Sequence, residues 1–236
     1  MRANDSLQPL LASGAVQVNF GAQPFSPFAP AGFRGFDGPE HLAEAAPAVS
    51  SGNVPAAVRT ASAALSAQTV QHFTEWSKSF PVGQGPAEDT TGERCGIGQS
   101  GDVWYLAGSS RGGQVRRSCT VPYGKSILVP VANTTAQAPA DVDCLNLQVP
   151  LRHFSDSATD LHFSVDGAPG THAIQRMGTG CFRTRNAGTG QSQVTATTGH
   201  WVLLPPPAPG RYLLRFGSRF ALDGFSQDVT YELEVR

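Results

Sequence analysis

Hydrophobic and polar residues alternate in many short segments beyond residue 101, and this period of two is typical of half-buried β-strands. The last segment, 228–235, places Val229, Tyr231, Leu233 and Val235 on one face and polar residues on the other. Similar segments, many bounded by Gly, Pro, Asn or Asp, are 102–107, 115–121, 125–132, 145–149, 161–166, 171–177, 192–197, 200–204 and 211–217. The pattern predicts an all-β fold, with two antiparallel sheets in a sandwich of jelly-roll or Greek-key type.

The period changes before these strands. Between Pro55 and Lys78 the larger residues recur at steps of three and four, which predicts one helix with Asn53 as its cap and Pro55 in its first turn. The recurring residues are Val58, Ala61, Leu65, Thr69, Phe73 and Trp76. We expect this apolar stripe to pack on a sheet.

The first 52 residues are rich in Ala, Pro, Gly and Ser, and residues 20–36 hold five of the 13 phenylalanines. Disordered segments are poor in aromatic residues, so we expect this irregular arm to wrap onto the domain. The alternative is a sticky surface at residues 16–36 that binds a second copy of the chain or another partner. We therefore divide the chain into an arm, 1–52, and a single domain of one helix and a β-sandwich, 53–236.

Charge and length exclude several classes of protein. The 236 residues suit one β domain, and 17 basic against 18 acidic residues give a net charge of −1. No basic field favours nucleic acid or an anionic membrane as a partner. No segment has the 18 or more apolar residues of a membrane span.

The four cysteines form an even set without a C-x-x-C pair, so two disulfides are the natural interpretation. Three connectivities are open, and we favour Cys95 with Cys119 and Cys144 with Cys181, because each pair closes a local segment. Disulfides predict a secreted or periplasmic protein whose leader is absent from this sequence. The alternative is four free thiols in a cytosolic protein.

No motif specifies a reaction. The acid and base candidates are Glu93, Asp102, His153 and His162, which lie on expected strand connections or nearby strands. His162, Asp166 and Asp160 are the candidate metal ligands, because His162 and Asp166 share one face of the segment 161–166. We expect no cofactor, with a structural calcium ion as the alternative, and leave open whether the protein is an enzyme, with a non-enzymatic role favoured.

Two aromatic residues with polar neighbours are the candidates for a ligand-binding rim: Trp201 beside His200, and Tyr212 beside Arg211. Rings of this kind stack on sugar faces while polar neighbours bind hydroxyl groups.

Two regions carry a family resemblance. The first covers roughly residues 72–135 and includes Cys95-Gly96, Gln99, the segment 103–108, Arg117, Cys119, Val121-Pro122, Gly124-Lys125, Pro130, Val131 and Asn133. The second is the pair of closing segments 210–214 and 229–233. Together they resemble secreted bacterial β-sandwich proteins of unknown function. The resemblance implies export and a sandwich, and no catalytic residue follows from it.

Three functions fit the sequence. The leading hypothesis is an exported binding or accessory module for a glycan or another extracellular ligand. A small secreted hydrolase or lyase is the alternative, and a structural protein that self-assembles through its Phe-rich arm is the third.

Overall fold

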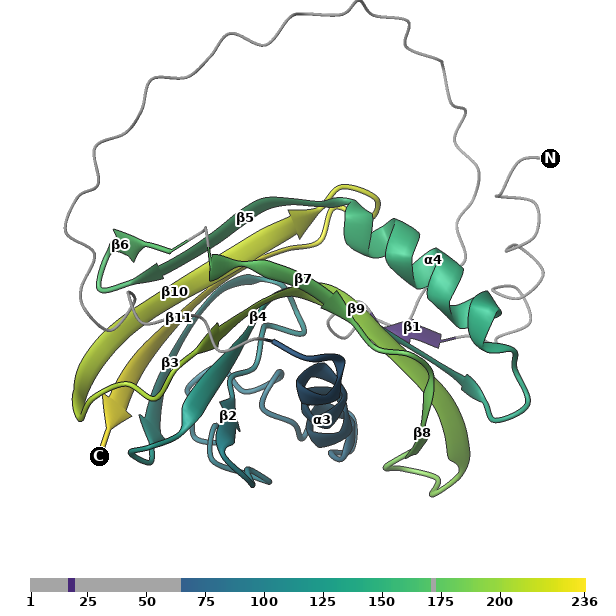
Figure 1. Cartoon of the computed structure of the whole chain (residues 1–236), viewed down its shortest axis with the longest axis horizontal. Helices are drawn as coiled ribbons and strands as arrows, with labels where there is room; N and C mark the ends of the chain where they lie inside the picture. Colours follow the sequence, from purple (N-terminus) through teal and green to yellow (C-terminus); the bar gives the residue numbers. More distant parts are fainter. Residues whose placement is uncertain (1–16, 20–64, 171–172) are drawn as a thin grey trace, which may run out of the picture.

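The computed structural model describes residues 17–19, 65–170 and 173–236. In this part of the chain the strands are β1 (Gln17–Asn19), β2 (Val103–Tyr105), β3 (Gly113–Val121), β4 (Ser126–Pro139), β5 (Ala158–Val165), β6 (Ala168–Pro169), β7 (Gln175–Gly178), β8 (Phe182–Arg185), β9 (Ser192–Leu204), β10 (Gly210–Phe220) and β11 (Ser226–Val235). The helices are α3 (Ala67–Lys78) and α4 (Cys144–Asp156) (Figure 1). The predicted boundary at residue 52 and the predicted helical segment 53–64 lie outside the described residues.

The strands form two sheets. The six-stranded sheet has the order β1-β4-β9-β7, with β2 also paired to β4 and β8 to β9. The five-stranded sheet has the order β3-β11-β10-β5-β6. Figure 1 shows α3 in the hollow of the curved six-stranded sheet and α4 across its other face.

The β-rich fold is confirmed, but the prediction of purely antiparallel sheets is wrong. β2 pairs with β4 in parallel, and β3 pairs with β11 in parallel over nine residues, Gly113–Val121. Neither pair is joined by a hairpin, because β3 crosses to the other sheet between β2 and β4 and many elements separate β3 from β11. The jelly-roll or Greek-key classification stays a prediction.

The segment 145–149, predicted as a strand, is part of α4. Asp143 caps this helix, and its Oδ1 accepts a hydrogen bond of 2.8 Å from the Leu145 N–H. The buried Leu147, Leu151 and Phe154 recur at helical steps, a period that five residues are too few to reveal. The prediction also missed β8 and divided β9 into two segments.

α3 confirms the predicted helix for Ala67–Lys78, but the prediction of one continuous helix from Pro55 is wrong at Leu65 and Ser66, which precede the helix with Ser66 in extended conformation. Ser66 caps it, and its hydroxyl accepts from the Thr69 N–H. Val70, Phe73 and Trp76 face the six-stranded sheet, where Phe73 lies 5.0 Å from Trp201 between ring centroids.

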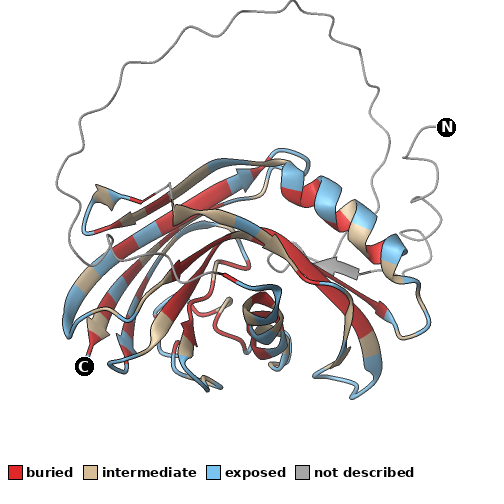
Figure 2. Cartoon of the chain, in the orientation of Figure 1, coloured by how far each residue is buried: buried red, intermediate tan, exposed pale blue. Residues whose placement is uncertain are grey.

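A second core lies between the two sheets. Buried positions alternate with exposed or half-buried ones along β11 and along residues 213–216 of β10, so one face of each strand belongs to this core (Figure 2). Its members include Leu106, Ile127, Val129 and Val202 from the side of the six-stranded sheet, and Phe163, Leu214, Phe216, Val229, Tyr231 and Leu233 from the five-stranded sheet.

Both favoured disulfides are present, Cys95–Cys119 and Cys144–Cys181. The first ties the loop between α3 and β2 to β3. The second ties the first residue of α4 to the segment between β7 and β8. Two disulfides fit an extracellular protein. Neither described helix is long and apolar enough to cross a membrane.

Candidate functional site

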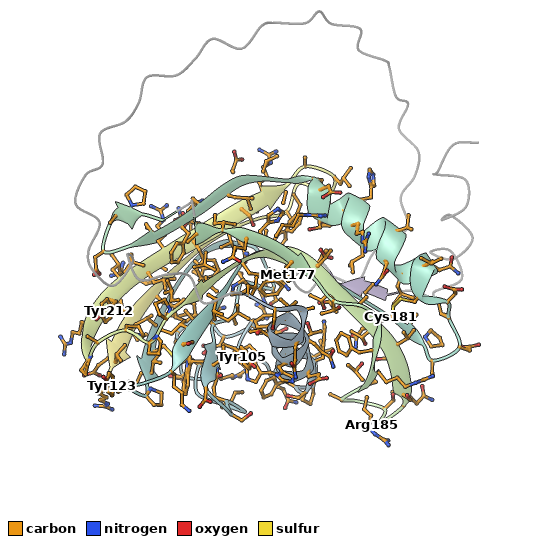
Figure 3. All side chains as sticks on the ribbon, viewed as in Figure 1. Tyr105, Tyr123, Met177, Cys181, Arg185 and Tyr212 are labelled. Carbon is orange, nitrogen blue, oxygen red and sulfur yellow. A yellow bond between two sulfur atoms is a disulfide. The ribbon has the colours of Figure 1, made fainter. Side chains whose placement is uncertain are left out.

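A cavity of about 190 Å³ lies beneath α4. The helix packs across β4 and β9 through Leu147 and Leu151, and the Cys144–Cys181 disulfide anchors its first turn. Figure 3 labels Met177, which lines the β7 side of the cavity, and Cys181, which belongs to the disulfide that anchors α4. The lining residues are Gln148, Leu151, Arg152, Arg176, Met177, Gly178, Thr179, Thr197 and Thr198.

Several polar groups of this cavity have free hydrogen-bonding capacity. Arg152 is exposed and forms no hydrogen bond or ion pair within the part of the chain that the structure describes. The Arg176 guanidinium pairs with the Asp156 carboxylate at the outer end of α4. Gln148 Nε2 donates to the Thr179 carbonyl at 3.4 Å, which leaves the amide oxygen of Gln148 as an acceptor.

His200 lies on the same face of the six-stranded sheet, two residues beyond Thr198 on β9. It pairs with Arg176 on β7 and with Ala132 on β4. Its Nδ1 is buried and has no hydrogen-bond partner among the described residues. Burial and the Arg176 charge lower the pKa of His200, and the Asp156 carboxylate opposes them, so its imidazole is neutral at pH 7.

Buried hydroxyl groups extend this polar region into the protein. The Thr134 side chain, in the row of Thr198, and the Ser155 side chain, one turn after Leu151 on α4, are buried without hydrogen-bond partners in the described structure. Buried polar groups of this kind are normally satisfied by water or a ligand. The region therefore has hydrogen-bonding capacity that the described residues do not use.

This arrangement can recognise an acidic group that carries hydroxyls. An Arg guanidinium forms paired hydrogen bonds with a carboxylate, while threonine hydroxyls and a glutamine amide suit hydroxyl groups. At about 190 Å³ the cavity is smaller than the roughly 300–1,000 Å³ of sites for drug-sized ligands. It therefore suits one small group, such as a single sugar residue.

The predicted aromatic rim is not formed. Trp201 is 0% exposed, and its indole N–H donates to the Met177 carbonyl, so the prediction of a sugar-stacking ring at Trp201 is wrong. Trp201 lies on the α3 side of β9 and His200 on the α4 side. Tyr212 and Arg211 lie at the start of β10 in the other sheet, where the Tyr212 hydroxyl donates to the Ala208 carbonyl. Of these four residues, His200 is the one beside the cavity.

The four acid and base candidates lie on separate elements. Glu93 is in the exposed loop between α3 and β2, and Asp102 is exposed and lies 3.7 Å from the Lys125 ammonium. His153 is on the exposed face of α4, and His162 is on β5. The structure does not bring the four together, so their convergence in one site is not confirmed.

The predicted metal ligands have other contacts. Asp166 forms the turn between β5 and β6, and its carboxylate accepts from the Leu213 N–H at 2.7 Å. His162 contacts the Asp160 carbonyl and the Asp228 carboxylate. Among the described residues no group of three His, Cys, Asp or Glu side chains is placed to hold a metal ion.

The sequence offered little signal for the cavity residues. Arg152 lies on the helix that was predicted in part as a strand, and Arg176 and Thr198 are ordinary strand positions. Their convergence depends on how α4 packs across β4 and β9 beside β7.

Comparison with known proteins adds little. No family model and no curated protein matches the chain. One similar solved structure is described as PbICP-C in complex with falcipain-2, with 8% identity, a TM-score of 0.24, and coverage of 58% of this chain and 100% of that one. Another is a family 123 glycoside hydrolase from Clostridium perfringens that hydrolyses glycolipid glycans, with 9% identity, a TM-score of 0.23, and coverage of 59% of this chain and 23% of that one. Both likenesses are too low to support an argument.

Proposed function

We propose that this protein is a secreted or periplasmic binding module whose ligand is a small acidic group with hydroxyls, in the class of sugar acids carried by glycans. The observation that carries the proposal is the Arg152 guanidinium, free of ion pairs with the described residues, on one cavity with Arg176, Gln148 and Thr198. The two disulfides support the compartment.

The expected contacts follow from the free groups of the cavity. Arg152 binds the carboxylate of the ligand, and Gln148 Oε1 and the Thr198 hydroxyl bind its hydroxyl groups. Arg176 stays paired with Asp156, and this ion pair fixes the orientation of the remaining N–H groups of Arg176. The neutral imidazole of His200 adds no charge to the site at pH 7.

Calorimetric titration with glucuronate and galacturonate, and with glucose as the neutral counterpart, tests this function. We expect the two acids to bind and glucose to bind at least about tenfold more weakly, since an ionic hydrogen bond contributes about 1.5–3 kcal/mol. Arg152→Gln should remove the preference for the acids. Arg219→Gln changes an exposed arginine on β10 in the other sheet and is the matched control. Equal binding by the two variants would refute the site, and no binding of either acid would refute the ligand class.

A further inference from the structure

A second cavity, of about 330 Å³, opens on the opposite face of the six-stranded sheet, between the end of α3 and β8. Figure 1 shows α3 in the hollow of the sheet with β8 at one end of that hollow. The lining residues are Glu75, Lys78, Ser79, Arg183, Thr184, Arg185 and Ala187.

The charges of this cavity are unbalanced, with three cationic side chains and one carboxylate. Glu75 Oε1 already accepts a hydrogen bond of 2.9 Å from Gln71. Arg183 has no ion pair within the described ranges, and Arg185 donates one hydrogen bond, to the Gly190 carbonyl. Figure 3 shows Arg185 at the free end of β8. The β8 side of the cavity therefore attracts anions.

Lys78 stands out among the cations. Its side chain is half-buried and forms no hydrogen bond or ion pair with the described residues. Burial lowers the pKa of Lys78 to about 8, although the Glu88 carboxylate raises it. An amine with this pKa is about one fifth neutral at pH 7.4, against about one part in a thousand for an ordinary lysine. Desolvated lysines of this kind act as nucleophiles towards carbonyl groups.

We propose that Lys78 is a covalent binding site for small aldehydes or 2-oxo acids that carry a negative charge. The neutral Lys78 Nζ attacks the carbonyl carbon, a C–N bond forms, and the carbonyl electron pair moves to the oxygen, which takes up a proton as the nitrogen releases one. The carbinolamine loses water to form an imine, without any change of oxidation state. Arg185 and Arg183 attract the acidic group of the ligand. This site is independent of the cavity beneath α4.

The chain supplies its own control, because Lys78 and Lys125 are its only lysines. Lys125 Nζ donates to the Gly101 carbonyl at 2.5 Å and lies 3.7 Å from the Asp102 carboxylate. Measuring both lysines therefore compares a half-buried amine that has no polar partner with an amine that has a hydrogen bond and a nearby carboxylate, in the same molecule.

The experiment treats the intact protein with glyoxylate and cyanoborohydride, which reduces imines and leaves disulfides intact, and locates the adducts by peptide mapping. Mapping separates both lysines from the α-amino group, whose pKa is also about 8. We expect Lys78 to be modified at least about tenfold faster than Lys125, since its neutral fraction is higher and its lower basicity cancels part of that advantage. Lys78→Arg should abolish this adduct, and Lys125→Arg should leave it unchanged.

Glycolaldehyde is a neutral aldehyde, so comparing its reaction with that of glyoxylate tests whether the acidic group of the ligand speeds the reaction. We expect Arg185→Gln to slow the reaction of Lys78 with glyoxylate several-fold and to leave the reaction with glycolaldehyde unchanged. Equal modification rates at Lys78 and Lys125 would overturn the proposal. Equal effects of Arg185→Gln on both aldehydes would overturn the assigned class of ligand.

Discussion

His162 and Asp228 approach each other across an intervening strand. The Nε2 of His162 lies 3.6 Å from Oδ1 of Asp228, although β10 separates β5 from β11. The residue of β10 that pairs with both is Gly217. Residues two strands apart are normally separated by roughly 10 Å at their backbones, so a side chain at position 217 would stand between them. The missing side chain allows the imidazole to lie over β10 and reach the carboxylate.

We expect Gly217→Ala to lower the free energy of unfolding by about 2 kcal/mol or more, because a Cβ there overpacks the sheet. It would lie 2.3 Å from the Gln227 carbonyl oxygen and 2.5 Å from His162 Cε1. Urea unfolding measures the change. Gly180→Ala is the matched control, because a Cβ at Gly180 meets no heavy atom within 4 Å. Equal stability of the two variants would contradict the crowding at Gly217.

Asp228→Asn should change how the free energy of unfolding depends on pH. The hydrogen bonds from Arg215 hold the pKa of Asp228 below its usual range, burial opposes them, and His162 adds to the lowering. An unfolded aspartate takes up its proton near pH 3.9, before the folded one does. The free energy of unfolding therefore falls as the pH drops below about 5 and through the folded pKa.

Melting temperatures of wild type and Asp228→Asn between pH 3 and 7 test this dependence. The stability advantage of the wild type should shrink as the pH falls below about 5. Asp141→Asn, at an exposed aspartate, is the control. A gap that stays constant with pH would show that Arg215 does not stabilise the ionised carboxylate.

His200 predicts a pH dependence in a different window. Burial lowers the pKa of His200, so as the pH falls an unfolded histidine takes up its proton first, near pH 6.5. The unfolding free energy should decrease as the pH falls from about 7 through the folded pKa, and His200→Asn should remove this decrease. Urea unfolding between pH 5 and 8 measures it. His153→Asn, on the exposed face of α4, is the control and should leave the wild-type pH dependence in place.

Arg117→Lys should destabilise the protein strongly even though it keeps the charge. Arg117 is 1% exposed, and a lysine cannot replace the spread of its guanidinium donors. The substitution removes several hydrogen bonds to buried acceptors, and we expect a loss of about 3 kcal/mol or more. These acceptors are the carbonyls of Ala87, Asp89, Ala107 and Gly108 and the hydroxyl of Tyr231.

Chemical denaturation measures this loss. Arg116→Lys changes the neighbouring exposed arginine, which pairs with Glu232, and should cost less than about 1 kcal/mol. Similar losses in the two variants would mean that the buried contacts of Arg117 are not stabilising.

The two disulfides should differ in their effect on the cavity beneath α4. Replacing Cys144 and Cys181 by alanine opens a loop with a sequence separation of 37 and should cost about 3–4 kcal/mol in the chain-entropy model. It should also weaken binding of glucuronate, because the anchor of α4 is lost.

Replacing Cys95 and Cys119 is the control. Their sequence separation of 24 predicts a similar loss of stability, again about 3–4 kcal/mol. Calorimetry with glucuronate separates the two effects, and binding should be unchanged in this variant. Equal weakening of binding in both double variants would show that the Cys144–Cys181 anchor has no specific role.

Local pattern predicted much of the β-structure. The alternation of Val229, Tyr231, Leu233 and Val235 correctly reports the buried face of β11. The segment 145–149 failed because its five residues fit either period, and the cap at Asp143 and the packing of Leu151 decide in favour of a helix. The parallel pairs were beyond prediction, because a strand's period does not specify its neighbour.

Hydrophobic periodicity was enough to predict the β-rich class and a helix that ends at Lys78, and the cysteine spacing favoured the two observed disulfide pairs among three connectivities. Tertiary structure decided the site. A hydrophobic period shows which face of an element is buried and does not show what covers it. Trp201 is therefore core because α3 lies over it, and Arg152 and Arg176 share a cavity because α4 packs across β4 and β9 beside β7.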